Sequence, residues 1–160
     1  LMGGGTILRE VEEAAAILEA DFNIEADIWS MTSINQLRRD GLQCDRWNRL
    51  NPEAKPRKPY VTSLLEGSVG PVICATDYIQ SYGDQIRPYI DQPYTVLGTD
   101  GYGRSDTRSQ LRKHFEVDRY FVVIATLKAL ADDGTLEQSV VTGAMKKFGI
   151  SGDKADPMFI

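Results

Sequence analysis

Short apolar runs alternate along the chain with segments in which apolar residues recur every three or four positions. Three of the runs are rich in β-branched and aromatic residues, which predicts strands at Ala26–Met31, Pro71–Thr76 and Tyr94–Gly98. The periodic segments predict amphipathic helices. Strands that alternate with helices are typical of an α/β layer fold, and no internal repeat or low-complexity tract interrupts the order.

The first predicted helix begins at Thr6, whose hydroxyl can cap the free N–H groups of a helix start. Its apolar positions follow the spacing i, i+4, i+7, i+8 and i+11, so the predicted buried face comprises Ile7, Val11, Ala14, Ala15 and Leu18. The remaining side is expected to face water and carries Glu10, Glu12, Glu13 and Glu19. Glu10 also lies near the positive helix start, where a carboxylate is favourable.

Single residues mark the other predicted helix boundaries. The tetrapeptide S-I-N-Q that starts at Ser33 fits a capping box, and Gly41 is expected to end the helix that follows. Asp77 is expected to cap the helix after the second strand. The helix after the third strand is expected to be capped by Ser105 or Asp106.

The segment from Asp118 to Gly134 admits two interpretations. Its β-branched centre favours a strand, whereas its length and the cap at Asp118 favour a buried helix, and we predict the helix. A last helix is predicted before Gly149, with a buried face of Val140, Val141, Ala144, Met145 and Phe148. Residues 151–160 are expected to be a loosely ordered tail.

The length of 160 residues predicts one domain over residues 1–160. A net charge of -5 argues against a nucleic-acid partner, because phosphate neutralisation needs a basic face. No apolar run approaches the ~18 residues of a membrane span, so we expect no membrane partner and a cytoplasmic location. Cys44 and Cys74 form no C-x-x-C pattern and are interpreted as reduced thiols. Because the chain opens abruptly on Leu1 in an apparent strand, we expect a fragment of a longer polypeptide.

Parallel strands place the loops that follow them at one edge of the sheet, where open α/β folds bind ligands. Helix starts at that edge favour an anion. The candidate anion-binding or interface residues of these loops are Gly3, Gly4, Gly5, Thr6, Asp77, Asp100, Gly101, Gly103, Arg104 and Ser105. However, G-T-D-G-Y-G fits neither G-x-G-x-x-G nor a P-loop, and Asp100 and Asp106 oppose a phosphate. The preferred interpretation is therefore a glycine-permitted turn, with Arg104 available for an ion pair or an interface.

Residues suited to catalysis are scarce. A nucleophile needs a base within hydrogen-bond reach, and the only histidine, His114, belongs to no G-x-S-x-G pattern. Asp132 and Asp133 adjoin Gly134 and are interpreted as a solvated helix end. Neither H-E-x-x-H nor D-x-D-x-D-G nor a cysteine cluster indicates a metal. We therefore expect no catalytic, cofactor-binding or metal-binding residue in this chain.

Six segments carry a resemblance to a known family: ADIWSMTSINQLRRDG, RWNRLNP, PYVT, ATDYIQSYGDQIRPYI, YTVLGTDGYGRSDTRSQLRKHFEVDRYFVV and KKFGI. They resemble the carboxyl-terminal domains of the homodimeric, bacterial first components of pyruvate dehydrogenase complexes. More distantly, the pattern is similar to the last domain of transketolases. The resemblance covers essentially the whole chain.

The resemblance implies a three-layer α/β/α fold around a mixed, mostly parallel five-stranded sheet with one antiparallel strand. It implies a parent enzyme that decarboxylates pyruvate and acetylates the lipoyl group of the acetyltransferase. Thiamine diphosphate and Mg²⁺ would be bound by the other domains of that enzyme, since no G-D-G…N motif occurs here.

The implied role is a non-catalytic assembly domain that is inactive in isolation. Its implied partners are the remaining domains of the same enzyme, the second subunit of a homodimer and the dihydrolipoyl acetyltransferase core. An alternative remains open from the loops alone: a regulatory module that senses an anion or a nucleotide.

Overall fold

The computed structural model describes residues 1–160, and its centre is a parallel sheet in the strand order β2-β1-β3-β4. Every pair of neighbouring strands is parallel, with Met2 of β1 opposite both Trp29 and Cys74. The strands are short: β1 (Met2–Gly3), β2 (Trp29–Ser30), β3 (Val72–Ala75) and β4 (Tyr94–Leu97).

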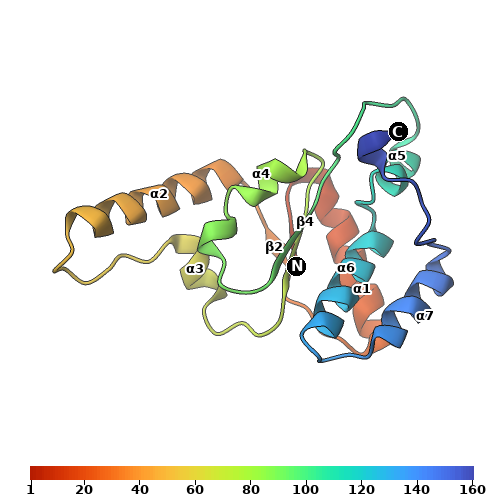
Figure 1. Ribbon diagram of the computed structural model, residues 1–160, viewed down its shortest axis with the longest axis horizontal. Coiled ribbons are helices and arrows are strands. Elements are labelled where there is room, and N and C mark those ends of the chain that lie inside the picture. The colour runs from red at the N-terminus through yellow and green to blue at the C-terminus, as the bar shows by residue number, and fades with distance from the viewer.

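Helices cover both faces of this sheet, which gives three layers (Figure 1). One face carries α1 (Leu8–Phe22), α6 (Arg119–Asp132) and α7 (Gln138–Phe148). The other face carries α2 (Ile34–Leu50), α3 (Tyr60–Leu65) and α4 (Gln80–Asp84). The remaining elements are α5 (Arg108–His114) and three 3-10 turns, η1 (Gly5–Ile7), η2 (Arg87–Tyr89) and η3 (Pro157–Phe159).

The side chains of β3 alternate between two hydrophobic clusters. Ile73 and Ala75 pack with α1, α6 and α7, whereas Val72 and Cys74 pack with α2, α3 and η2. All four residues are buried, as expected for a parallel strand that is covered on both faces. Burial also raises the pKa of the Cys74 thiol to about 11, so it is protonated at neutral pH.

The three-layer α/β/α architecture confirms the fold class, but the sheet differs from the expected one. It has four strands rather than five, and all of them are parallel rather than mixed. The apolar run Tyr120–Ala125, the strongest strand candidate after β4, lies inside α6 instead. The helix predicted there is confirmed, and its cap is Asp118, whose carboxylate accepts from the N–H groups of Tyr120 and Phe121.

Of the two boundaries predicted for helix α2, the start is confirmed and the end is wrong. Ser33 caps it and accepts from the backbone N–H of Gln36 at 3.3 Å. Gly41 does not end it, because the helix continues to Leu50. A Cβ atom on Gly41 would lie 2.3 Å from the ring of Tyr89, so the glycine provides space for an aromatic side chain rather than a stop.

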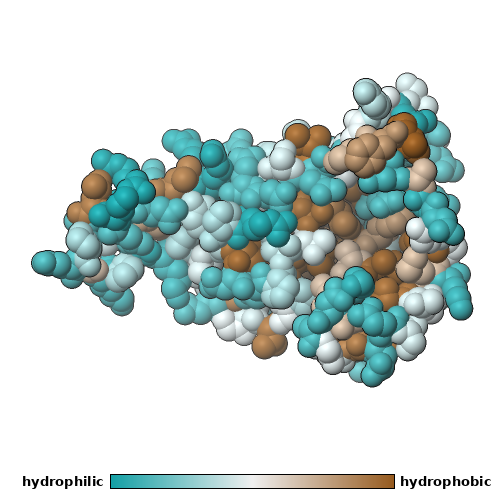
Figure 2. Space-filling model, viewed as in Figure 1, coloured by the Kyte–Doolittle hydropathy of each residue, from teal (hydrophilic) through white to brown (hydrophobic).

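The far half of α2 projects beyond the sheet (Figure 1). The loop after it returns alongside, because Asn48 exchanges two hydrogen bonds with the backbone of Arg57 at 2.9 and 2.7 Å. The Arg57 guanidinium also lies 4.3 Å from the centre of the Trp47 ring. Figure 2 shows that this projection is largely hydrophilic, with isolated apolar side chains. None of the helices combines the length and the hydrophobicity that spanning a membrane would require.

Candidate functional site at the carboxyl edge of the sheet

The loops after β1, β3 and β4 meet at the carboxyl edge of the sheet, and polar contacts join them. The Thr6 hydroxyl donates to Oδ2 of Asp77 at 3.0 Å, across 71 positions of sequence. The Thr99 hydroxyl donates to the backbone carbonyl of Asp77 at 3.0 Å. Two of the predicted site residues, Thr6 and Asp77, are therefore in direct contact.

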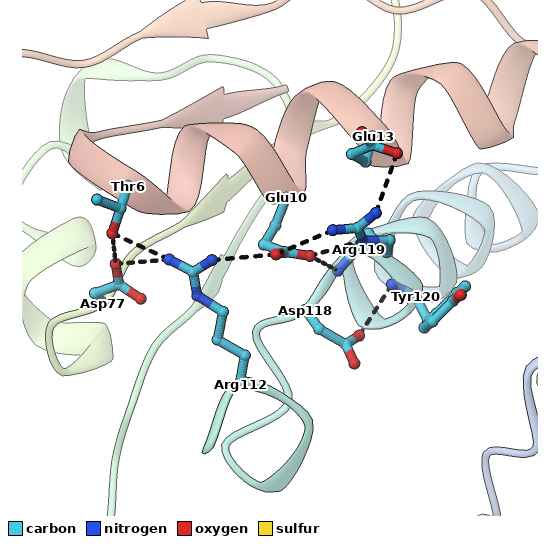
Figure 3. A network of polar contacts seen from close by, with 8 residues as sticks. All are labelled: Thr6, Glu10, Glu13, Asp77, Arg112, Asp118, Arg119 and Tyr120. Atoms are coloured by element: carbon cyan, nitrogen blue, oxygen red, sulfur yellow. Dashed lines mark hydrogen bonds and ion pairs between the residues drawn. The ribbon is translucent and has the colours of Figure 1, made fainter. Parts of the chain in front are cut away.

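An internal cation occupies this edge (Figure 3). Arg112 of α5 donates through Nη2 to the Thr6 hydroxyl at 3.1 Å and to the Asp77 carboxylate at 3.2 Å. Its Nη1 donates to Oε1 of Glu10 at 3.1 Å. The Arg112 side chain is only 9% exposed, so the meeting point of the loops is filled by the protein's own guanidinium.

Glu10 accepts from a second arginine at the start of α6. Arg119 donates to Oε2 of Glu10 through Nε at 2.9 Å and through its backbone N–H at 3.1 Å. Its Nη1 also pairs with Glu13 at 3.1 Å (Figure 3). The expectation that Glu10 faces water is wrong: the residue is 8% exposed, because two arginines from distant segments satisfy its carboxylate.

The electrostatics of the site keep Glu10 ionised. Burial alone raises the pKa of a carboxyl group, but here the hydrogen bonds from Arg119 and the charges of Arg119 and Arg112 outweigh it and lower the pKa of Glu10. Asp118 responds in the opposite direction, since burial raises its pKa despite the N–H groups that it caps. With its lowered pKa, the Glu10 carboxylate is a fixed ion rather than a proton acceptor near neutral pH.

The caps predicted at this edge are wrong for Thr6 and Asp77, whose side chains bond to each other and to Arg112. Thr6 lies within the 3-10 turn η1, and neither that turn nor α1 has a side-chain cap. Helix α4 begins only at Gln80, three positions beyond Asp77. Asp100 of the next loop accepts from the backbone N–H of Gln80 at 2.8 Å, so a carboxylate from another segment takes the expected role.

The cap of α5 is also displaced. The helix begins at Arg108, and the Thr107 hydroxyl accepts from the N–H of Gln110 at 3.4 Å. Ser105 and Asp106 lie too early in the chain to reach this turn, although Asp106 accepts from the N–H of Thr107 at 2.6 Å. The predicted helix is thus confirmed, with its cap and its start one or two positions later.

The predicted glycines divide between close approach and open loop. A Cβ atom on Gly4 would lie 2.6 Å from the carbonyl oxygen of Met31, so the loop after β1 passes tightly over the end of β2. Gly101 has a φ of +119° and abuts the carbonyl of Pro157 in the C-terminal segment. The other candidate glycines are Gly3 in β1, Gly5 in η1 and Gly103, which has open space around it.

Arg104 and Ser105 lie away from the Arg112 contacts and border a separate cavity of about 480 Å³, together with His114. The sequence placed them with Thr6 and Asp77 in one set of strand-end loops. The structure divides this set into an edge closed by Arg112 and a neighbouring cavity.

The arrangement at the edge clamps segments together but offers no reacting pair. Nowhere do three or more His, Cys, Asp or Glu residues gather in a way that could hold a metal ion. Mg²⁺ with a diphosphate needs free oxygen ligands, whereas Glu10 and Asp77 are engaged by Arg112 and Arg119. The residues of this edge therefore do not fit thiamine diphosphate.

The sequence patterns missed Glu10, Arg112 and Arg119 as a connected site, because Arg112 lies 102 positions from Glu10. The sequence nevertheless contained one indication that Glu10 is buried. Glu10 follows Ile7 by three positions and precedes Ala14 by four, so it falls on the buried stripe of its own helix. A carboxylate on such a stripe needs a partner, although the stripe does not say which one.

Comparisons with known proteins find relatives along the whole chain. Residues 1–118 match the family model described as the transketolase-like TK C-terminal domain. The chain is 56% identical over 159 residues to the pyruvate dehydrogenase E1 component of Pseudomonas aeruginosa, covering 99% of the chain and 18% of that protein. It is 46% identical over 158 residues to the protein of the same name from Escherichia coli K12, covering 98% of the chain and 18% of that protein. The chain thus spans less than a fifth of the length of these relatives.

Proposed function

Because this chain belongs to the family of transketolase-like C-terminal domains, we propose that it is the non-catalytic assembly domain of a pyruvate dehydrogenase E1 component. The observation that carries the proposal is the 56% identity over 99% of the chain to a protein of that name. In this proposal the parent enzyme decarboxylates pyruvate with thiamine diphosphate and Mg²⁺ held by its other domains. It then acetylates the lipoyl group of the dihydrolipoyl acetyltransferase core.

The chemistry of the carboxyl edge supports a structural role. Glu10, Asp77, Arg112 and Arg119 neutralise one another, which leaves no free acid, base or nucleophile among them. Their contacts connect the loops after β1 and β3 with α1, α5 and α6. Such a clamp holds the loop after β4 in a defined position for contact with a partner.

The surface that we propose for assembly lies where that loop meets the C-terminal segment. Gly101 abuts Pro157, and the neighbouring side chains Tyr102 and Phe159 are each 78% exposed. Met158 is also exposed, and apolar residues gather at this corner of the molecule (Figure 2). Exposed aromatic residues on two adjoining segments are typical of interface anchors, and the remaining domains or the second subunit of a homodimer are the proposed partners.

A chimera tests the proposal. The corresponding 18% of the Pseudomonas aeruginosa E1 component is replaced by this chain, and the overall pyruvate dehydrogenase reaction is measured with the acetyltransferase core. We expect the chimera to form the same oligomer and to retain activity within a few-fold of the parent. The chain alone, given pyruvate, thiamine diphosphate and Mg²⁺, is expected to release no carbon dioxide.

Two results would contradict the proposal. Turnover of pyruvate by the chain alone would show that it is catalytic. A chimera that folds, as judged by circular dichroism, but neither assembles nor turns over would show that the chain does not serve this role. A matched chimera that carries the native segment of the Escherichia coli relative controls for the effect of substitution itself.

A further inference from the structure

The helix that carries Arg112 also borders a second polar feature, a cavity of about 480 Å³. Its lining comes from the loop after β4, from α5 and from the C-terminal segment. Three cations, Arg104, Lys113 and Lys154, face one carboxylate, Asp106. This balance is opposite in sign to the chain as a whole, whose net charge is -5, and it favours an anionic ligand.

Two of the three cations have no acidic partner. Lys154 pairs with Glu116 at 2.8 Å and also donates to the carbonyl of His114 at 2.9 Å. Arg104 and Lys113 form no ion pair within 4.0 Å, so their charges are available to a ligand. The cavity therefore differs from the carboxyl edge, where each arginine is already matched by a carboxylate.

His114 belongs to the same lining and adds no charge to it. Its Nε2 atom is buried without a hydrogen-bond partner, while Phe115 packs edge-on with ring centres 4.8 Å apart. Burial and then the charges of Arg104 and Lys154 lower the pKa of His114, so the ring is neutral near neutral pH. A neutral imidazole with its proton on Nε2 donates one hydrogen bond.

We propose that this cavity binds the phosphoryl group of a small phosphate-bearing ligand, with Arg104 and Lys113 as its charged donors. A guanidinium presents a planar fork that matches two oxygens of a phosphate, and an ammonium group supplies a point charge. Because Lys154 is paired with Glu116, the remaining charges of the lining are Arg104 and Lys113 against Asp106, and this net charge of +1 favours an anion such as phosphate. Ser105 and Gln110 border the same cavity and add neutral donors.

Isothermal titration of the longest natural polypeptide that carries this chain tests the site, with inorganic phosphate as the first probe at constant ionic strength. We expect saturable binding of one phosphate per chain. Arg104→Ala and Lys113→Ala should each weaken it about tenfold or more, as expected for the loss of a charge-assisted hydrogen bond. Titration with a nucleoside diphosphate distinguishes the source: tighter binding than phosphate assigns the site to an organic phosphate, and equal or weaker binding assigns it to phosphate itself.

A charge-matched control distinguishes phosphate binding in the cavity from general attraction by the electrostatic field of the protein. The double variant Arg39→Ala/Lys55→Ala removes two positive charges from exposed positions outside the cavity, and phosphate affinity should stay unchanged. Equal weakening by this control and by Arg104→Ala/Lys113→Ala, or no saturable binding by the unmodified protein, would overturn the proposal. Circular dichroism confirms that each variant is folded. Since no readout depends on pyruvate turnover, the phosphate site and the assembly role can fail separately.

Discussion

Glu10 and Glu13 lie one helical turn apart and contact the same arginine, yet their surroundings differ. The Glu10 side chain is 11% exposed and is held by Arg112 and Arg119, whereas Glu13 is 58% exposed and pairs with Arg119 alone. Removing one partner of a buried ion pair leaves an uncompensated charge, while water compensates an exposed one. Two similar residues should therefore contribute very differently to stability.

Glu10→Gln is expected to lower the free energy of unfolding by about 3 kcal/mol or more, because Arg112 and Arg119 lose their shared counter-charge. Glu13→Gln serves as the matched control and should cost about 1 kcal/mol or less. Urea denaturation followed by circular dichroism measures both values. Equal losses would show that burial of Glu10 does not matter to the clamp.

The lowered pKa of Glu10 predicts a pH dependence of stability. The unfolded chain takes up a proton at this carboxyl near its ordinary pKa of 4.5, whereas the folded chain takes it up only at lower pH. The stabilisation is therefore complete above that value and is lost as the pH falls through the folded pKa. Denaturation midpoints below about pH 4.5 should fall less steeply for Glu10→Gln than for the unmodified chain.

The comparison with the variant is necessary because other carboxyl groups titrate in the same range. The hydrogen bond from Lys128 lowers the pKa of Asp132, so protonation of Asp132 also lowers the free energy of unfolding as the pH falls. Asp118 has a raised pKa, so its protonation raises the free energy of unfolding as the pH falls, which is a slope of the opposite sign. An unchanged slope in Glu10→Gln would assign the acid sensitivity to Asp132 instead.

At the scale of elements, α2 shows how a tertiary contact reverses a local preference. Glycine in a helix interior costs about 1 kcal/mol relative to alanine, which is why Gly41 predicts a helix end. The structure keeps the helix intact through Gly41, since the ring of Tyr89 takes the space that a side chain would need. Gly143 in α7 is also inside a helix, but nothing lies within 4 Å of the position its Cβ would take.

These two glycines give opposite predictions for the same substitution. Gly41→Ala should lower the free energy of unfolding by about 1–3 kcal/mol, because the new methyl group displaces Tyr89 from the core. Gly143→Ala should raise it by about 0.5–1 kcal/mol through helix propensity alone. Thermal or urea denaturation of both variants provides the measurement. Stabilisation by Gly41→Ala would mean that Tyr89 can move away without loss.

At the scale of the whole molecule, the exposed corner around Tyr102 and Phe159 bears on assembly. In the longer polypeptide, the double variant Tyr102→Ser/Phe159→Ser is expected to weaken oligomer formation at least about tenfold, because interface anchors carry most of the binding energy. The unfolding free energy of the chain itself should change little, since both side chains are 78% exposed. Analytical ultracentrifugation measures the dissociation constant.

Val69→Ser is the control for this experiment. Val69 is 99% exposed and lies in the loop before β3, at the opposite edge of the sheet from the loop after β4. It should leave the oligomer unchanged. Loss of assembly in the Val69 variant, or none in the double variant, would move the interface away from the corner proposed here.

Local patterns predicted most of the elements. The alternation of apolar runs, the caps at Ser33 and Asp118 and the stop at Gly149 are confirmed, because each depends on residues within a turn or two of one another. The expected fifth strand came from the family resemblance, whereas the apolar runs of the chain indicated four strands, as the structure has. The run that starts at Tyr120 has the composition of a strand, but its length and the cap at Asp118 predicted the helix that the structure contains, which packs against α1 and α7.

The sequence by itself determined the fold class, because periodicity, caps and the segments shared with relatives are all written along the chain. It also determined that no familiar catalytic pattern is present. Only the tertiary structure decided how the charged residues are used. It placed Arg112 between Glu10 and Asp77 and left Arg104 beside an unpartnered His114. The physical reason is that a charge is neutralised by whatever lies within a few ångströms, and for Glu10 that partner is 102 positions away.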